Sequence, residues 1–451
     1  MSDANMDRRE FVRLGAAGVV VGKLVMEPKR RDDRIRGAND RIAIALIGAG
    51  RQGLGDLGNA MRRPDVDVVA VCDVYQPNLA KGAALAPKAE QYGDFRRVLD
   101  RKDIDAVIIG TPDHWHAAQT ILACEAGKDV YVEKPISVTI TEGRRMVEAA
   151  RKYNRVVQAG TQQRSGKHFQ QVAELLKSGR IGKITQVRSW NSGNEYPEGI
   201  GNVADSAPPP GLDWDMWLGP APSRPFNAHR FGVDPDRWSS FRWYWDYAGG
   251  MMTDWGVHWL DIVQMAMGVD APTSISTMGG KFCLQDDRET PDTILASFLY
   301  PGFICTYENR SANNGLINGK TGGILFHGTD GTLFVDRQGF EIIPEKKKTG
   351  TTTVDRTTWL QVENSNQHHQ DHMLDFLDCI KSRKAPVSEI EIGHRSTTTA
   401  LLGNIAYRTG RRIEWDAKNE KIVGDKDASR YLEREYRRPW GTKGALSERG
   451  S

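Results

Sequence analysis

A short apolar segment that runs directly into a glycine-rich turn most limits what this chain can fold into. Residues 41–47 read Arg-Ile-Ala-Ile-Ala-Leu-Ile, a predicted buried strand, and Gly48-Ala-Gly50-Arg-Gln-Gly53 follows at once and opens a predicted helix. An acidic residue, Asp73, ends the next apolar run. Strand, glycine pattern, helix and a later acidic residue together are typical of a dinucleotide-binding βαβ unit.

Each part of this pattern has a physical task. Gly48 permits a tight turn, Gly50 lets the backbone approach a pyrophosphate, and Gly53 allows close packing. Arg51 and Gln52 stand at the start of the helix, whose free N–H groups attract an anion. Asp73 can accept hydrogen bonds from both ribose hydroxyls and would repel a 2′-phosphate, so the pattern favours NAD over NADP.

The next segments repeat this alternation of short apolar runs and amphipathic stretches. Further strands are predicted at residues 66–72, 106–109, 129–132 and 156–159. Thr139-Ile-Thr-Glu142 is a capping box that opens one crossover helix. This order predicts a doubly wound parallel sheet, a Rossmann fold, over residues 39–160, with ligands at the carboxyl ends of its strands.

Beyond residue 160 the pattern becomes antiparallel. A strand is predicted at residues 184–190, and hairpins join 293–299 to 303–307 and 323–327 to 332–335. Residues 249–267 are predicted to be one helix. We expect an α+β domain over residues 161–415, so that the fold class is α/β overall, and a charged extension over 416–451.

Charge and composition exclude several classes of function. The 451 residues carry 61 Lys+Arg and 58 Asp+Glu, a net charge of +3, which is too small an excess for a nucleic-acid partner. No segment has the roughly 20 apolar residues of a membrane span. The five Cys are scattered singly, which suggests neither a disulfide framework nor a thiolate metal site.

The first 38 residues have a different character. Asp7-Arg8-Arg9-Glu10-Phe11-Val12-Arg13 precedes a Gly- and Ala-rich apolar stretch, Leu14 to Val21. This resembles a twin-arginine signal, so we expect residues 1–38 to be a signal and linker and the folded protein to be exported to the periplasm. A basic tail on a cytoplasmic protein is the alternative.

Three further segments, with the glycine pattern, resemble the Gfo/Idh/MocA oxidoreductases. They are Thr111-Pro-Asp-His-Trp-His116, Glu133-Lys-Pro135 and Gly249-Gly-Met-Met-Thr-Asp-Trp-Gly-Val-His258. The resemblance implies that Thr111, Pro112, His116 and Glu133 lie beside the cofactor. It implies that Lys134 contacts both cofactor and reacting hydroxyl, that Asp254 and His258 complete the catalytic group, and that Gln162 is a nicotinamide neighbour.

The residue types support these roles independently. Asp254 and His258 are four apart on the predicted helix, so the carboxylate can orient the imidazole or raise its pKa. Oxidation of a secondary alcohol needs a proton acceptor and a cation beside the developing alkoxide. His258 and Lys134 match these two roles, and the sequence leaves open which of them takes the proton.

Aromatic residues point to the substrate. Seven of the 12 Trp are gathered just before and within the helix predicted at 249–267. They are Trp214, Trp217, Trp238, Trp243, Trp245, Trp255 and Trp259. Indole rings stack on the C–H faces of sugars, which favours a carbohydrate or cyclitol, although a core or a subunit contact would use the same residues. The candidate polar partners are Arg164, His168, Arg242, Tyr244 and Asp246.

Two groups of histidines raise the question of a metal. One group is His114 and His116, and the other is His368, His369 and His372, in which only the first and third share a predicted helical face. Neither group has a third ligand at suitable spacing, so no metal site is predicted.

Three functions are compatible with this sequence. The first is NAD-dependent oxidation of a secondary hydroxyl of a sugar, glycoside or cyclitol. The second is a redox-neutral glycoside hydrolase that oxidises, eliminates, hydrates and reduces with one bound NAD, and Tyr196, Tyr244 or His168 would supply its extra acid or base. The third is a cofactor-bound protein without catalysis. An uncovered face of the antiparallel sheet would make the protein a homodimer or homotetramer.

Overall fold

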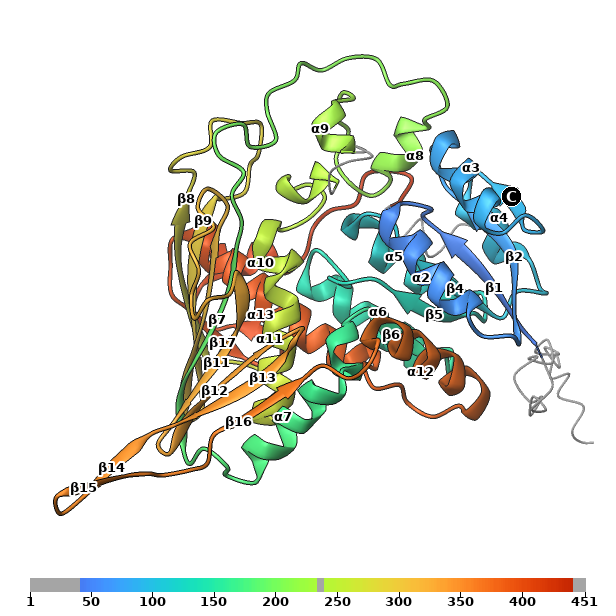
Figure 1. Ribbon diagram of the computed structural model, residues 1–451. Coiled ribbons are helices and arrows are strands. Elements are labelled where there is room, and N and C mark those ends of the chain that lie inside the picture. The colour runs from blue at the N-terminus through green and yellow to red at the C-terminus, as the bar shows by residue number, and fades with distance from the viewer. Residues whose placement is uncertain (1–40, 233–238, 441–451) are drawn as a thin grey trace, which may run out of the picture. The chain divides into compact units, whose positions relative to one another are not determined.

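The computed structural model describes residues 41–232 and 239–440, and the apolar run before the glycine-rich turn forms β1 (Ile42–Ile47) in the middle of a parallel sheet (Figure 1). The sheet has six strands in the order β3-β2-β1-β4-β5-β6. The other five are β2 (Val66–Cys72), β3 (Glu90–Tyr92), β4 (Ala106–Ile109), β5 (Asp129–Val132) and β6 (Val157–Ala159). The predicted Rossmann sheet is confirmed; β3 was not predicted, because its three polar residues carry no apolar signal.

Helices connect these strands and cover the sheet. They are α2 (Arg51–Met61), α3 (Gln76–Leu85), α4 (Phe95–Asp100), α5 (Asp113–Glu125) and α6 (Ile140–Lys152). The predicted capping box is present at the start of α6, where Thr139 and Glu142 satisfy each other's backbone N–H groups. Because β1, β4 and β5 are parallel, the loops that follow these strands all begin at the same edge of the sheet.

Later parts of the chain also pack on this sheet. In α12 (His368–Ser382), Met373, Phe376 and Leu377 join the apolar core beneath β1. Near the end of the described chain, Trp440 packs edge-on against Trp115 of α5 at a ring distance of 4.8 Å. The described part of the segment that we expected to be a charged extension, residues 416–440, thus packs on the Rossmann helices.

A second sheet of ten strands holds the rest of the core. Its order is β16-β13-β12-β11-β7-β10-β9-β8-β17-β18, and all neighbours pair antiparallel except β7 and β10. The strands are β7 (Ile184–Ser192), β8 (Ser274–Gly280), β9 (Thr293–Tyr300), β10 (Phe303–Arg310), β11 (Gly322–Gly328), β12 (Gly331–Asp336), β13 (Gly339–Pro344), β16 (Leu360–Glu363), β17 (Ile413–Asp416) and β18 (Lys421–Ile422). Both predicted hairpins are present, as β9–β10 and β11–β12, and the predicted α/β class with a mainly antiparallel second sheet is confirmed.

The helices of this part lie on one side of the ten-stranded sheet (Figure 1). They are α7 (Lys167–Lys177), α11 (Gly256–Met267) and α13 (Ile390–Thr409). Side chains on β9 alternate, so that Ile294, Ala296 and Phe298 are buried under the helices while Leu295 and Leu299 are 50% and 40% exposed. One face of the sheet is therefore partly apolar and open.

The helix predicted at residues 249–267 is broken. It consists of α10 (Gly250–Asp254) and α11, with Trp255 between them. Gly250, with a φ of +60°, begins α10, and Trp255 between the two helices keeps right-handed helical dihedrals (φ −90°, ψ −33°), so the interruption is confined to one residue. Asp254 ends one helix and His258 lies in the first turn of the next.

Shorter elements complete the described chain. They are η2 (Gln162–Ser165), α8 (Trp214–Leu218), α9 (Ala228–Phe231), η3 (Ser240–Trp243), β14 (Lys346–Thr349), β15 (Thr352–Asp355), α14 (Lys426–Ser429) and η4 (Arg430–Leu432). No helix of the described segments is long and apolar enough to cross a bilayer. The predicted twin-arginine signal and Trp238 lie outside the described residues.

Candidate active site

The glycine-rich turn has the conformation that its sequence predicts. Gly48 has a φ of +92°, where a side chain would also strike the backbone of Gly110 and Thr111. A Cβ on Gly53 would lie 2.1 Å from the carbonyl oxygen of Gly48, so α2 packs directly on the turn. A Cβ on Gly50 would meet nothing within 4 Å. The space beside Gly50, at the start of α2, fits the backbone approach of a pyrophosphate.

Asp73 stands at the end of β2, beside this turn. Its Oδ2 accepts a hydrogen bond from the backbone N–H of Ala49 at 2.8 Å, and its Oδ1 accepts one from Tyr75 at 2.8 Å. Burial raises the pKa of Asp73 to about 6, although these backbone donors lower it in part. With Asn78 and Lys81, Asp73 lines one end of the cavity, where the sequence places the adenosine ribose.

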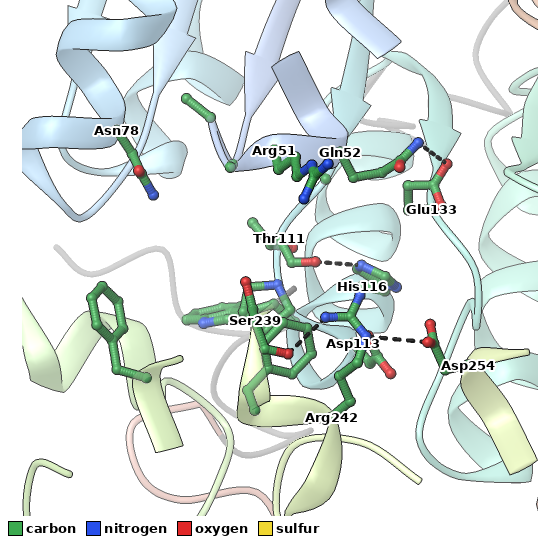
Figure 2. A pocket seen from close by; sticks show the side chains of 18 of the residues that line it. Arg51, Gln52, Asn78, Thr111, Asp113, His116, Glu133, Ser239, Arg242 and Asp254 are labelled. Atoms are coloured by element: carbon green, nitrogen blue, oxygen red, sulfur yellow. Dashed lines mark hydrogen bonds and ion pairs between the residues drawn. The ribbon is translucent and has the colours of Figure 1, made fainter. Parts of the chain in front are cut away.

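A cavity of about 1480 Å³ begins at this turn and extends to the second sheet's helices. Typical small-molecule pockets measure roughly 300–1,000 Å³. The cavity is therefore large enough for a dinucleotide and a second molecule. Figure 2 shows residues from the Rossmann loops and from η3 and α10 facing one another across it.

Lys134 and Asp254 meet in this cavity from the two parts of the chain. The Nζ of Lys134 donates to Oδ1 of Asp254 at 2.6 Å and to its backbone carbonyl at 2.9 Å. The Nε of Arg242 lies 3.3 Å from the other carboxylate oxygen (Figure 2). Burial would raise the pKa of Asp254, but the charges of Lys134 and Arg242 outweigh burial and hold the pKa well below its ordinary value.

His258 also lines the cavity, but its protonation differs from our expectation. Its side chain is buried, and no hydrogen-bond partner of its Nδ1 occurs among the described residues. Burial lowers the pKa of His258 well below its usual value, and the charges of Lys134 and Arg337 lower it further. Of the two effects predicted for Asp254, a raised pKa is contradicted, mainly because the imidazole is buried; that Asp254 orients the imidazole stays a prediction.

Glu133 precedes Lys134 and holds an amide network. Its Oε1 accepts from the Nε2 of Gln162 at 2.6 Å and, more weakly, from that of Gln52 at 3.5 Å (Figure 2). Burial raises the pKa of Glu133 and of the neighbouring Asp56. Gln162, Gln52 and Arg51 all line the cavity, as predicted for cofactor neighbours.

His116 connects two of the loops that line the cavity. One ring nitrogen lies 2.8 Å from the carbonyl oxygen of Thr111 and the other 2.7 Å from that of Pro135 (Figure 2). Pro112 is the N-cap of α5, and Thr111, Pro112 and His116 all line the cavity. His116 thus fixes the loops after β4 and β5 against each other.

Four of the five predicted polar substrate partners, Arg164, His168, Tyr244 and Asp246, do not line this cavity. Arg164 is buried and pairs with Asp261, its Nε lying 2.8 Å from Oδ2. His168 is buried and bonds the carbonyl of Asp336 at 2.9 Å. Tyr244 is 3% exposed within the aromatic cluster around Tyr247. These three residues were predicted from their polar side chains, but in the folded protein those side chains lie among buried residues away from the cavity.

The tryptophans divide between two roles. Trp217, Trp243 and Trp255 line the cavity, as expected for substrate contacts. Trp214 stacks on Trp217 from behind at 4.7 Å, and Trp259 belongs to the core under the second sheet. Trp245 stacks near Tyr407, and Asp246 pairs with Arg224.

Sequence reasoning missed several polar residues that line the cavity, among them Asp113, Ser239, Arg337 and His369. Asp113 opens α5, and burial raises its pKa to about 7. Ser239 accepts a hydrogen bond from Arg242 at its carbonyl, 2.7 Å away (Figure 2). Arg337 comes from the β12–β13 loop and His369 from the start of α12. Asp113 stands inside the quoted Thr-Pro motif and His369 inside a histidine group considered only for a metal, but no local pattern marks Ser239 or Arg337.

The histidine groups have structural partners. His114 bonds the carbonyl of Trp217, and His372 bonds the carbonyl of Ala159 and the hydroxyl of Ser165. In the described parts of the chain, no three His, Cys, Asp or Glu side chains are grouped so as to hold a metal ion.

A Rossmann sheet, a glycine-rich turn and a Lys, Asp and His group in one cavity define the class of dinucleotide-dependent oxidoreductases. Comparison with known families agrees. Residues 42–161 match the model described as "Oxidoreductase family, NAD-binding Rossmann fold", and residues 166–442 match "Oxidoreductase family, C-terminal alpha/beta domain". The chain belongs to the Gfo/Idh/MocA oxidoreductase family, and its Rossmann domain is NAD-binding.

The curated relatives match only part of this chain. The uncharacterized oxidoreductase YrbE of Bacillus subtilis is 33% identical over 177 residues, which are 39% of this chain and 50% of that protein. Inositol 2-dehydrogenase of Salmonella typhimurium is 36% identical over 157 residues, 34% of this chain and 45% of that protein. A glycosyl hydrolase family 109 protein of Stenotrophomonas maltophilia is 34% identical over 148 residues, which are 30% of this chain and 31% of that protein. The matches span half or less of these relatives.

Solved structures match over more of the chain. Levoglucosan dehydrogenase in complex with NADH has a TM-score of 0.64 at 16% identity and covers 83% of this chain and 99% of that chain. The WlbA dehydrogenase from Bordetella pertussis, in complex with NADH and UDP-GlcNAcA, has a TM-score of 0.62 at 19% identity, with the same coverage. At these identities the likeness shows the fold alone.

Proposed function

We propose that this protein is an NAD-dependent oxidoreductase that acts on a secondary hydroxyl of a sugar, glycoside or cyclitol. One observation carries the proposal. Lys134, Asp254 and His258 line the same cavity as the glycine-rich turn and Asp73. The group that can handle a hydroxyl proton therefore faces the groups that fit a dinucleotide.

The residues divide the chemistry between them. When bound, NAD supplies the nicotinamide carbon that takes the hydride from the alcohol carbon. Lys134 is paired with a carboxylate, so it is a cation that can donate to the developing alkoxide. His258 is kept neutral by burial, so it has a lone pair for the hydroxyl proton. Asp254 holds the Lys134 ammonium in place.

The substrate class rests on the aromatic lining and on the relatives. Trp217, Trp243 and Trp255 offer flat apolar surfaces suited to sugar rings. Among the curated relatives is an inositol 2-dehydrogenase. These support a small polyhydroxylated substrate.

One reaction series tests this function. Purified protein is incubated with a panel of glycosides, free sugars and cyclitols, with and without added NAD, while NADH absorbance and released reducing sugar are followed together. NADH accumulation without bond cleavage is the expected result. A protein that binds NAD but gives neither NADH nor cleavage with any compound contradicts the proposal and favours the third function, a cofactor-bound protein without catalysis.

Redox-neutral glycoside hydrolysis is the second candidate. Transient oxidation at C3 acidifies the C2 proton, elimination expels the C1 substituent, water adds, and the same cofactor reduces the product. Relatives named glycosyl hydrolase family 109 proteins favour it, as does Tyr196, which lines the cavity and is 57% exposed. Of its three suggested acids or bases, His168 and Tyr244 lie outside the cavity lining. Cleavage without net NADH and without added cofactor would support this candidate.

The open sheet face supports a homodimer or homotetramer. Met278, Leu295, Leu299 and Ile304 are exposed on β8, β9 and β10, which are adjacent strands. An apolar patch on a flat sheet is suited to a second copy. Light scattering should give a mass of two or four chains, and Leu295→Arg should reduce it; a monomeric wild type would contradict this assembly.

Export by the twin-arginine route is proposed from the Arg8-Arg9 segment alone. Residues 1–38 fused to a reporter should carry it to the periplasm, and Arg8→Lys with Arg9→Lys should stop export. A reporter that stays in the cytoplasm would favour the alternative, a basic tail.

A further inference from the structure

Arg337 is a partly buried cationic side chain in the cavity, and it lacks a carboxylate partner among the described residues. Arg337 is the first residue of the two-residue loop that joins β12 to β13, where Asp336 pairs with Gly339. Its Nη2 donates to the side-chain oxygen of Gln163 at 3.3 Å, and its guanidinium lies over the ring of Trp255 at 4.6 Å. Its Nε is enclosed without an acceptor, and no carboxylate lies within ion-pairing distance among the described residues.

The loop that carries Arg337 is firmly held. Oδ1 of Asp336 accepts from the N–H groups of Gln338 and Gly339, at 2.8 and 3.2 Å. The carbonyl of Asp336 bonds His168, and its Oδ2 lies 3.1 Å from the Nζ of Lys320. The arginine is therefore presented to the cavity by a fixed hairpin.

The charges around Arg337 do not neutralise it. The acidic groups whose charges act on Arg337, Asp254 and Glu133, form no ion pair with it, and Asp254 is already paired with Lys134 and Arg242. Burial lowers the pKa of Arg337 to about 10, so the side chain remains a cation at neutral pH. Burial and the charge of Arg337 lower the pKa of His369, which faces the same space, to about 4. A partly buried cation among neutral imidazoles is stabilised by an anion from outside.

We propose that Arg337 binds a carboxylate of the substrate, so that the substrate is a sugar acid, a polyhydroxylated ring or chain bearing a carboxylate, rather than a neutral sugar. This inference rests on the proposed oxidoreductase function and specifies its substrate class. Trp255 lies under Arg337 and also contacts the ring of His258 at 5.7 Å. The carboxylate would thus sit close to the hydroxyl that reacts.

A carboxylate fits better than a phosphate. The planar guanidinium donates two parallel hydrogen bonds to a planar carboxylate. A dianionic phosphate would be repelled more strongly than a carboxylate by Asp254 and Glu133, the two acidic groups that act on Arg337. The phosphates of the dinucleotide belong at the other end, beside Gly50.

The test measures binding and turnover separately. Titration calorimetry on the NAD-loaded full chain compares glucuronate, galacturonate and gluconate with glucose, galactose and myo-inositol, and with inorganic phosphate. At least one acid should bind about 10- to 100-fold more tightly than its neutral counterpart. Equal affinity for acids and neutral sugars, or phosphate binding as tight as that of the acids, would overturn the proposal.

Variants place the effect at Arg337. Arg337→Gln should weaken the acid about 10- to 100-fold and leave neutral sugars and NAD unchanged, whereas Arg356→Gln, at an exposed arginine paired with Asp330, should change nothing. Arg337→Lys keeps the charge and should recover part of the affinity. Unchanged acid binding in Arg337→Gln, or weakened NAD binding, would overturn the assignment. If neutral sugars give NADH and acids do not bind, this inference fails while the oxidoreductase function stands; if acids bind through Arg337 but no compound is oxidised, the function fails instead.

Discussion

Lys134 and Asp254 lie 120 positions apart in the sequence, yet the ammonium nitrogen of one is 2.6 Å from the carboxylate of the other. Lys134 follows β5 of the Rossmann sheet, and Asp254 ends α10, which packs under the second sheet. This ion pair joins the two parts of the chain at the cavity between them. It fixes the charged group of Lys134 where a substrate hydroxyl would meet the dinucleotide.

Lys134→Met should abolish turnover while NAD binding largely survives. The cation beside the developing alkoxide is lost, and electrostatic groups of this kind contribute about 10²- to 10³-fold or more. We expect kcat to fall about a thousandfold, measured as NADH formation on the best substrate of the panel. Lys152→Met, at an exposed lysine near Tyr153, is the matched control. Turnover that persists in Lys134→Met would remove Lys134 from the site.

Substitution of two glycines of the glycine-rich segment should differ in its effect on stability. Gly53→Ala places a Cβ 2.1 Å from the carbonyl of Gly48, so the free energy of unfolding should fall by about 1–3 kcal/mol. Gly50→Ala meets nothing within 4 Å and should leave that free energy within about 0.5 kcal/mol of wild type.

The same pair should separate in cofactor affinity. A methyl on Gly50 occupies the space that suits the pyrophosphate, so the NAD dissociation constant should rise tenfold or more. Gly58→Ala, in α2 and also without neighbours within 4 Å, is the control. It should neither lower the free energy of unfolding nor raise the NAD dissociation constant. Equal NAD affinity in Gly50→Ala and wild type would count against this cofactor site.

Local patterns account for most of the fold. The runs that became β2, β4 and β5 were predicted with their observed bounds, because buried parallel strands are continuous apolar segments. The capping box at Thr139 and both hairpins carried equally local signals. The one-residue break at Trp255 did not, because no proline stands there and Trp255 itself keeps right-handed helical dihedrals.

The site was predictable only where a motif carried it. Lys134, Asp254, His258 and the glycine-rich turn stand in segments with recognisable spacing, and all line the cavity. Arg164 and His168 were misplaced, because whether a polar group faces a cavity or a buried partner is decided by residues such as Asp261. Arg337 could not be found, since a two-residue hairpin loop gives no hint of what it faces.

Cofactor choice should depend on Asp73. Asp73→Asn keeps an acceptor for the N–H of Ala49 but removes the negative charge that would repel a 2′-phosphate. NAD should bind about tenfold more weakly, because a hydrogen bond to a charged group is replaced by one to a neutral group. NADP should bind more tightly, so the difference between the dissociation constants for NAD and NADP should become smaller. Fluorescence titration with both nucleotides measures this, with Asp67→Asn at an exposed position as control; an unchanged ratio would argue against ribose recognition by Asp73.

Asp113 and Asp254 should give opposite dependences of stability on pH. Burial raises the pKa of Asp113 to about 7, whereas an unfolded Asp titrates near 3.9. The folded state therefore binds the proton more tightly, and this carboxyl lowers stability increasingly as the pH rises from about 4 to 7. Asp113→Asn removes that loss, so the variant should gain on the order of 1–4 kcal/mol over wild type at pH 8 and nothing near pH 4.

Asp254 works in the other direction. Its pKa lies below the unfolded value, so its ion pairs contribute stability above about pH 4, which is lost as the pH falls further. Asp254→Asn leaves Lys134 and Arg242 without their carboxylate and should destabilise the protein by about 3–5 kcal/mol at pH 8, the range seen when one partner of a buried pair is removed. Urea unfolding of cofactor-free protein at pH 4, 6 and 8 measures both variants. If Asp113→Asn destabilised the protein at pH 8 as much as Asp254→Asn, the Asp113 carboxylate would have to be paired with a cation in the folded state, and the raised pKa at the start of α5 would be wrong.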